Sequence, residues 1–211
     1  MEHEHKKSII DAGEVTTARL ETLVDGVFAI AMTLLVLDIH IPDLVSGANS
    51  SDLFVQVIAL WPRILSFLIT FIILGMFWVG HHTEFRYIKK LDNELMWQNI
   101  FYLLFVSFLP FTAALLGRYP FNQAAVIIYG VHLSIMVLLH YFMWQHASKH
   151  TGLAVENLDP RVNKQANRLV YFAVPFYALA ILLSFWRIEA SLIIYAVLPL
   201  PYIFGWTYKW I

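Results

Sequence analysis

One stretch, RLETLVDGVFAIAMTLLVLDIHIP from Arg19 to Pro42, constrains most strongly what this chain can fold into. It opens with ionisable residues and continues into an apolar run that is long enough to cross a bilayer, for which about 20 residues suffice. From Gly26 to Leu37, only Thr33 carries a side-chain hydroxyl. Asp25 lies where a membrane helix would begin, so its carboxylate needs a partner, water or a helix terminus.

The composition of the whole chain is also typical of a membrane protein. Hydrophobic residues make up 59% of it and charged residues 14%, and the mean hydropathy is +0.65. Soluble domains carry about 25% charged residues, so a chain this apolar predicts a polytopic membrane protein. The net charge of -1 argues against a nucleic-acid partner, because no basic face is available to neutralise phosphates. The absence of cysteine excludes disulfides, thiolate metal sites and thiol catalysis.

Six apolar segments along the chain have about the length of a spanning helix. The predicted fold class is therefore all-α, a polytopic membrane protein with six transmembrane helices. Residues 1–16 are polar and predict a cytosolic tail, and residues 17–211 predict one six-helix domain. The six predicted helices are Leu20–Ile41, Leu53–Gly80, Leu95–Leu116, Gln123–Gln145, Leu169–Trp186 and Leu192–Tyr208.

The basic residues predict the orientation of these helices. Most Lys and Arg residues fall in the N-terminal tail and in the loops that share its side of the membrane. Short, positively charged loops stay in the cytosol, which predicts a multi-pass protein of the cell membrane with both termini cytosolic. The first outer loop, from Asp38 to Asp52, has three aspartates and no Lys or Arg. That loop is either merely solvated or raises the local cation concentration at the mouth of a pore.

The first predicted helix carries an apolar stripe. At about 100° per residue, one face holds Ile30, Thr33, Leu34, Leu37 and Ile41, and Asp25 points away from it. One interpretation is that this stripe faces a symmetry axis and lines a narrow pore, which apolar rings gate by dewetting. The other interpretation is ordinary lipid contact or helix packing.

Polar side chains gather at the cytosolic end of the same helices. The second helix ends in GMFWVG and runs on into HHTEF, which places Trp78, His81 and His82 near the depth of Arg19 and Asp25, and the third helix brings Asn99 to that depth. These side chains either form a buried polar cluster that locks the first helix in place or lie at the interface without meeting.

The motif RLETLVDGVFAIAMTLLVLDI resembles the first-helix signature of the transmembrane protein 175 family of potassium channels. WVGHH and LMWQNIFYLLFVSFLPF are similar to the family as well, so the resemblance extends over all six helices. It implies a homotetramer in the bilayer that conducts potassium ions through a pore lined by the first helix. Leu23 and Val24 replace the Phe and Ser usual in the family, which removes one hydroxyl from the polar network.

The resemblance also implies roles for single residues. It assigns Ile30, Leu34 and Leu37 to a hydrophobic constriction, and Thr33 to a position linked to selectivity. It assigns a polar network to Arg19, Asp25, Trp78, His81, His82 and Asn99.

The mode of conduction follows from the absence of a familiar filter. The chain has no TVGYG loop, whose carbonyl oxygens replace the hydration shell of potassium. A ring of isoleucine and leucine offers an ion nothing in exchange for lost water, so passage requires a wetted state or a partly hydrated ion. We therefore expect slow, leak-type conduction with modest discrimination among monovalent cations, and no cofactor.

A secondary transporter of a small cation or solute is the alternative. Pro110, Pro175, Pro199 and Pro201 are candidates for breaks in helices, and broken helices often line substrate sites. Against this, no carboxylate lies in the middle of any predicted helix to couple protons or sodium, and prolines are tolerated in membrane helices.

The histidine pattern predicts neither an enzyme nor a metal site. His81 and His82 are adjacent and splay apart on a helix, and only His146 and His150 have i, i+4 spacing, at a loop boundary. Interfacial histidines are usually solvated, so no metal is expected there. His132 and His140 lie inside the fourth helix, where we expect them to be packed and hydrogen-bonded.

Overall fold

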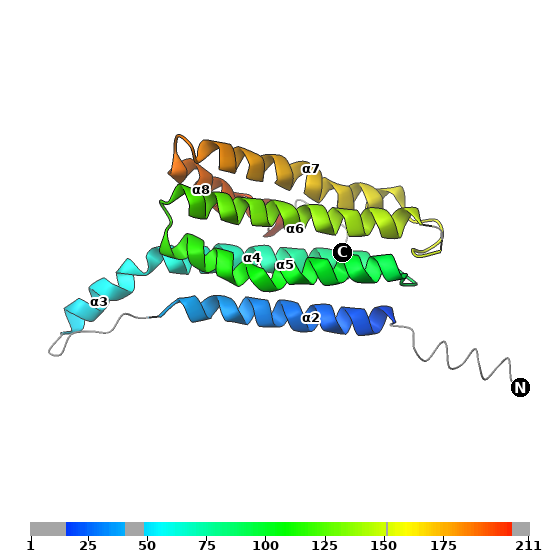
Figure 1. Cartoon of the computed structure of the whole chain (residues 1–211), viewed down its shortest axis with the longest axis horizontal. Helices are drawn as coiled ribbons and strands as arrows, with labels where there is room; N and C mark the ends of the chain where they lie inside the picture. The colour runs from blue at the N-terminus through cyan, green and yellow to red at the C-terminus, as the bar shows by residue number, and fades with distance from the viewer. Residues whose placement is uncertain (1–15, 41–48, 151, 204–211) are drawn as a thin grey trace, which may run out of the picture.

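The computed structural model describes residues 16–40, 49–150 and 152–203. This part of the chain is helical and contains no strand beyond one isolated bridge between Ile88 and Ala154, which confirms the predicted all-α class. Figure 1 shows the helices packed side by side as a bundle. The elements are α2 (Thr17–Leu34), the 3-10 helix η1 (Leu35–Asp38), α3 (Ser50–Ala59), α4 (Trp61–Phe85), α5 (Asn93–Arg118), α6 (Gln123–Lys149), α7 (Pro160–Leu183), α8 (Ile188–Val197) and α9 (Leu200–Ile203).

Five helical segments are long and apolar enough to cross a membrane. They are α2 with η1, α4, α5, α6 and α7. The sixth predicted span, Leu192–Tyr208, lies only partly within the described residues, where α8 and the short α9 are separated at Leu198 and Pro199. The number of spans therefore stays a prediction, and so does the position of the stripe residue Ile41, which lies outside the described residues.

The second predicted helix is two helices, so the prediction of one helix from Leu53 to Gly80 was wrong. α3 ends at Ala59 and α4 begins at Trp61, with Leu60 between them at φ -77° and ψ -2°. Pro62 explains the break, because it has no N–H for the carbonyl of Ile58 and its ring clashes there. α3 leaves the bundle at this point (Figure 1) and buries none of its side chains.

The predicted fifth helix began too late. α7 starts at Pro160 instead of Leu169, because Asp159 caps it by accepting a hydrogen bond from the Arg161 N–H and Pro160 fills the first helical position. The first two turns are polar, so hydropathy alone misses them. Likewise α4 ends at Phe85, five residues beyond the predicted end at Gly80.

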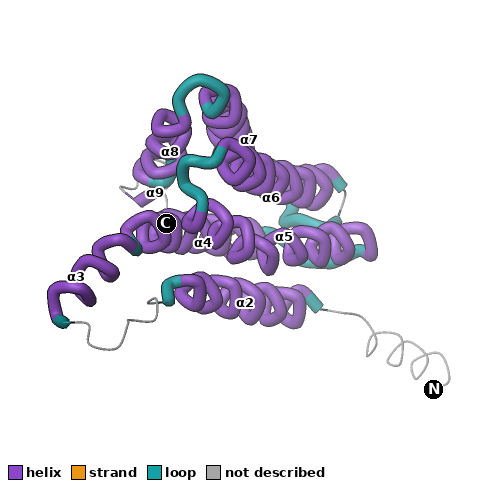
Figure 2. Tube along the Cα trace, turned by 60° about the vertical axis from the view of Figure 1, so that its left-hand side comes forward, coloured by secondary structure: helices purple, strands orange, loops and turns teal. Residues whose placement is uncertain are grey.

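α5 lies at the centre of the bundle and contacts α2, α4 and α6, while α7 and α8 pack beyond α6. Figure 2 shows α2 on one side of the bundle and α7 and α8 on the other. Lipid is as apolar as these side chains, so helix contacts in a bilayer rely on close packing and on interhelical hydrogen bonds, each worth about 0.6 kcal/mol. Such bonds join Ser66 to the Ala113 carbonyl at 2.7 Å and Thr70 to the Tyr129 hydroxyl at 2.9 Å.

Candidate functional site

α2 presents two different faces. Its buried face packs on α4 and α5 through apolar side chains at helical spacing: Leu20, Val24, Phe28, Ala31 and Leu35. The predicted stripe lies on the other face, where Ile30 is 60%, Leu34 42% and Leu37 69% exposed. Thr33 is exposed too, and its hydroxyl hydrogen bonds to the Ala29 and Ile30 carbonyls at 3.0 and 2.9 Å. A single chain therefore leaves the described part of the stripe, from Ile30 to Leu37, uncovered.

Two of the three aspartates between Asp38 and Asp52 have partners within the chain. Asp38 accepts two hydrogen bonds from Arg118, and Asp52 caps α3 together with Asn49. Asp43 lies outside the described residues. The pairing of Asp38 with Arg118 offsets part of the negative charge of this segment.

The polar residues near the N-terminal end of α2 and the C-terminal end of α4 form two separate sets. In the first set, Trp78 Nε1 donates a hydrogen bond to Asp25 Oδ1 at 2.8 Å, and the Trp78 ring stacks on His82 with 5.8 Å between the ring centroids. This set ties α2 to α4. The Arg19 side chain is exposed and makes no hydrogen bond with any other predicted member of the network in the described part of the chain.

The second set is buried between α4, α5 and α6. Asn99 Nδ2 donates a hydrogen bond to His81 Nε2 at 2.8 Å, and the two residues are 0% and 1% exposed. The His81 ring stacks between Phe85, at a centroid distance of 4.0 Å, and Tyr102, at 6.0 Å. Adjacent positions on a helix face different directions, which is why His81 and His82 belong to different sets.

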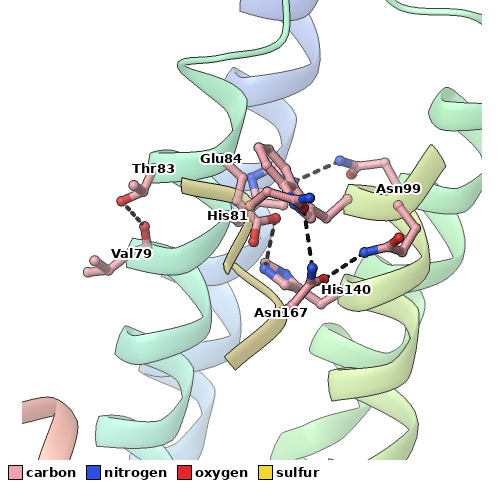
Figure 3. Close-up of polar contacts among 10 residues, drawn as sticks. Val79, His81, Thr83, Glu84, Asn99, His140 and Asn167 are labelled. Carbon is pink, nitrogen blue, oxygen red and sulfur yellow. Dashed lines mark hydrogen bonds and ion pairs between the residues drawn. The ribbon is translucent and has the colours of Figure 1, made fainter. Parts of the chain in front are cut away.

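Two further residues belong to the buried set, and the sequence predicted neither of them as a member of it. Glu84 Oε2 lies 3.0 Å from His140 Nε2, with Glu84 8% and His140 2% exposed. Figure 3 shows both near His81 and Asn99. The predicted helix stopped at Gly80, whereas α4 continues to Phe85 and carries both His81 and Glu84. The sequence signal for it is the three-residue spacing from His81 to Glu84.

Two of the three histidines of α6, His132 and His140, are packed as expected. His132 accepts a hydrogen bond from Thr112 through Nδ1 at 2.9 Å and donates one from Nε2 to the Phe105 carbonyl at 3.0 Å, which confirms the prediction for it. His140 is buried, but its polar contact is the short approach to Glu84 rather than a well-aligned hydrogen bond.

We predict that Glu84 and His140 contribute to the free energy of unfolding as a coupled pair. We expect His140→Leu to lower the free energy of unfolding by about 3 kcal/mol, because it leaves the buried Glu84 carboxyl without its partner. The double variant Glu84→Leu with His140→Leu removes both polar groups and should recover most of that loss. Unfolding of the detergent-solubilised protein measures the difference. Equal stability of the single and double variants would contradict the coupling.

His146 is held between two carboxylates at the start of α5. Its Nε2 donates to Asp92 Oδ2 at 2.8 Å, and its Nδ1 lies 3.4 Å from Glu94 Oε1. The His150 ring lies 4.2 Å away, between ring centroids. Within the described ranges, no group of three or more His, Cys, Asp or Glu side chains is arranged to hold a metal ion.

Asp92 supports a pH prediction. Burial raises the pKa of its carboxyl, but the hydrogen bonds from the Leu95 N–H and from His146, together with the nearby histidines, outweigh burial and lower the pKa. A lowered pKa means that Asp92 stabilises the fold above its unfolded value near 4 and loses this effect as the pH falls through the folded value. We expect Asp92→Asn to lower the Tm at pH 7 and the difference from the wild type to shrink below about pH 4. A constant difference would contradict this role.

Together, the long apolar helices packed side by side define a polytopic membrane protein. Comparison with known proteins agrees with this class. A profile of the family described as "Endosomal/lysosomal potassium channel TMEM175" matches residues 19–110. The chain belongs to this family. Its members are ion channels, which confirms the prediction that the chain is not an enzyme.

Individual relatives match most of the chain. Potassium channel B446_29190 of Streptomyces collinus is 32% identical, over 90% of this chain and 92% of its own length. Potassium channel Cha6605_3372 of Chamaesiphon minutus is 34% identical, over 80% of this chain and 84% of its own length. Among solved structures, a lysosomal potassium-selective channel TMEM175 homolog from Chamaesiphon minutus matches with a TM-score of 0.79 and 28% identity, covering 92% of this chain and 98% of that one.

Proposed function

We propose that the chain is the subunit of a potassium-permeable leak channel of the cell membrane. Four copies surround a pore lined by α2, in which Ile30, Leu34 and Leu37 form a hydrophobic constriction with Thr33 beside them. The observation that carries this proposal is the uncovered stripe on α2, opposite the face that packs on α4 and α5. Relatives that match most of the chain are named potassium channels, which supports the choice of ion.

The exposed face of α2 fits the lining of a narrow apolar pore. The described part of the stripe runs from Ile30 to Leu37, about two helical turns, and Thr33 is its only polar side chain. Four such faces around an axis make successive apolar rings, which close to ions when water leaves them and conduct when they are wetted. This predicts slow conduction and modest selectivity, because the rings supply no oxygen to replace the hydration shell.

The polar sets at the cytosolic end serve to orient α2 in this proposal. Asp25 lies on the flank of α2, and its bond to Trp78 ties that flank to α4. Rotation of α2 about its own axis would break this bond and turn Ile30 away from the pore. The hydrogen bond between His81 and Asn99 holds α4 against α5. The bond between Asp25 and Trp78 therefore fixes the rotation of α2 relative to two helices that are themselves held together.

The basic residues support cytosolic termini. Arg86, Lys89 and Lys90 lie in the connection from α4 to α5, and Arg161 and Lys164 lie in the first turns of α7. Figure 1 shows these segments at the same end of the bundle as the start of α2. Because positive loops stay in the cytosol, this end and the tail of residues 1–16 belong there.

The transporter alternative loses part of its basis. α5 runs on through Pro110 and α7 through Pro175, so neither helix is broken at its proline. Both helices are also packed against α6, as structural helices of a bundle would be.

Recording from the purified protein in planar bilayers tests the proposal. With a potassium gradient across the membrane, we expect currents that grow with potassium concentration and reverse near the potassium equilibrium potential, with a smaller shift when sodium replaces potassium. Flux that saturates and shows counterflow would identify a transporter instead. Silent bilayers that contain correctly folded protein would refute the channel.

A further inference from the structure

An ion pair joins the outer ends of α2 and α5. Arg118 donates hydrogen bonds to Asp38 Oδ1 from Nε at 2.9 Å and from Nη2 at 2.6 Å. The Asp38 side chain is 14% exposed and that of Arg118 48%. The two residues are 80 positions apart in the sequence, so this contact connects separate helices and not neighbours along the chain.

The negative charges where α2 and α5 end favour a cationic side chain at this position. α2 and α5 run in the same direction, since each is antiparallel to α4, and their C-terminal ends lie together (Figure 1). A helix C-terminus carries partial negative charge, so a carboxylate there is unfavourable. Asp38 stands at the end of η1, directly after α2, and Arg118 stands in the last turn of α5. The Arg118 guanidinium therefore offsets one carboxylate and two helix ends.

The α5 side of this contact is firmly held. A Cβ on Gly117 would lie 3.1 Å from Arg63 Cα and 3.3 Å from Ser66 Cβ, so α5 packs directly on the backbone of α4 beside Arg118. Ser66 also donates a hydrogen bond to the Ala113 carbonyl, one turn earlier. Arg118 thus extends from a position that close packing fixes.

The α2 side is weaker. η1 is a four-residue 3-10 helix, an element with poor hydrogen-bond geometry, and Leu35 is its only buried residue. Leu37 directly precedes Asp38 and is 69% exposed. Without the ion pair, Leu35 alone would pack this turn onto the bundle.

We propose that Arg118 is a positioning residue for the outer end of the pore. By holding Asp38, it fixes the turn Leu35–Asp38 against α5 and so sets where Leu37 stands in the constriction. This role rests on the proposed function, because it takes α2 to be the pore helix. Arg118 itself contacts no ion and acts through Asp38.

A spin label tests the tether without any need for current. The chain has no cysteine, so Val36→Cys accepts a single label next to Leu37. We expect Arg118→Gln to increase the mobility of this label. Arg187→Gln is the matched control, because Arg187 is another exposed arginine at the same end of the bundle and makes no ion pair with a described residue. Unchanged mobility in Arg118→Gln would overturn the tether.

Potassium currents test the consequence for the pore. We expect Arg118→Gln to change the leak by about two- to fivefold, the range for an equilibrium that an exposed ion pair controls, and to lower the preference for potassium over sodium. The reversed pair, Asp38→Arg with Arg118→Asp, should return both towards the wild type, whereas a purely local defect would not be rescued. If the wild type conducts and the Arg118→Gln variant conducts equally well with the same selectivity, the positioning role is overturned. Absent wild-type current would overturn the proposed function itself, while the label still decides whether the tether exists.

Discussion

Ile30→Asn should raise potassium flux through reconstituted protein about tenfold. In the proposed tetramer this change places four amides in one apolar ring, where they hold water and so favour the wetted, conducting state. Moving an amide between water and an apolar site is worth about 1–3 kcal/mol in proteins, and tenfold corresponds to about 1.4 kcal/mol. Flux of potassium into liposomes, driven by a gradient, measures the effect.

The matched control for this experiment is Ile193→Asn. Ile193 lies on α8 and is 62% exposed, compared with 60% for Ile30, but α8 is on the far side of the bundle from α2 (Figure 2). The same chemical change there should leave the flux at the wild-type level. Equal flux in all three proteins would show that Ile30 does not face the pore, and equal increases in both variants would indicate a nonspecific leak.

Gly130→Ala is expected to destabilise the bundle by about 3 kcal/mol, at the upper end of the cost of overpacking a core. A Cβ on Gly130 would overlap the Tyr195 hydroxyl and would lie 2.9 Å from Ile181 Cγ1. Tyr195 has little room to move. It is 1% exposed, and its hydroxyl donates a hydrogen bond to the Val126 carbonyl at 3.0 Å. The added methyl group therefore forces α6 away from α7 and α8.

Gly75→Ala is the control for this clash. The same methyl group on α4 would meet only Met32 Cε, at an ordinary contact distance of 3.9 Å. Alanine also favours a helix over glycine by about 1 kcal/mol, so we expect this variant to be as stable as the wild type or slightly more so. Thermal unfolding in detergent compares the three proteins. A Tm of Gly130→Ala equal to that of the wild type would show that α8 packs less closely on α6 than the structure has it.

The helices that the sequence predicts well are those whose signal is local. Gln123–Gln145 is α6 short of its last turn, and Leu95–Leu116 is α5 within two residues at each end. A bilayer demands a continuous apolar run of set length, and that run is visible residue by residue. The break at Pro62 and the polar start of α7 at Pro160 were equally local, but a hydropathy scan passes over both.

The pairing of polar side chains was less accessible. The sequence places Asp25, Trp78, His81 and Asn99 at one depth, and depth does not say which of them meet. The structure pairs Asp25 with Trp78 and His81 with Asn99, because on α4 Trp78 meets α2 whereas His81 meets α5. It also adds Glu84 beside His140, which no spacing along one helix connects.

The sequence by itself therefore determined that this chain is an all-α membrane protein and that α2 carries one nearly uninterrupted apolar stripe. Hydropathy and helical periodicity act within a single segment, so they need no knowledge of the other helices. The tertiary structure alone decided that the chain leaves the described part of this stripe, from Ile30 to Leu37, uncovered and that Asp38 is held by Arg118. Both depend on which helices lie beside α2 and at what rotation, and contacts between distant segments of the chain determine that.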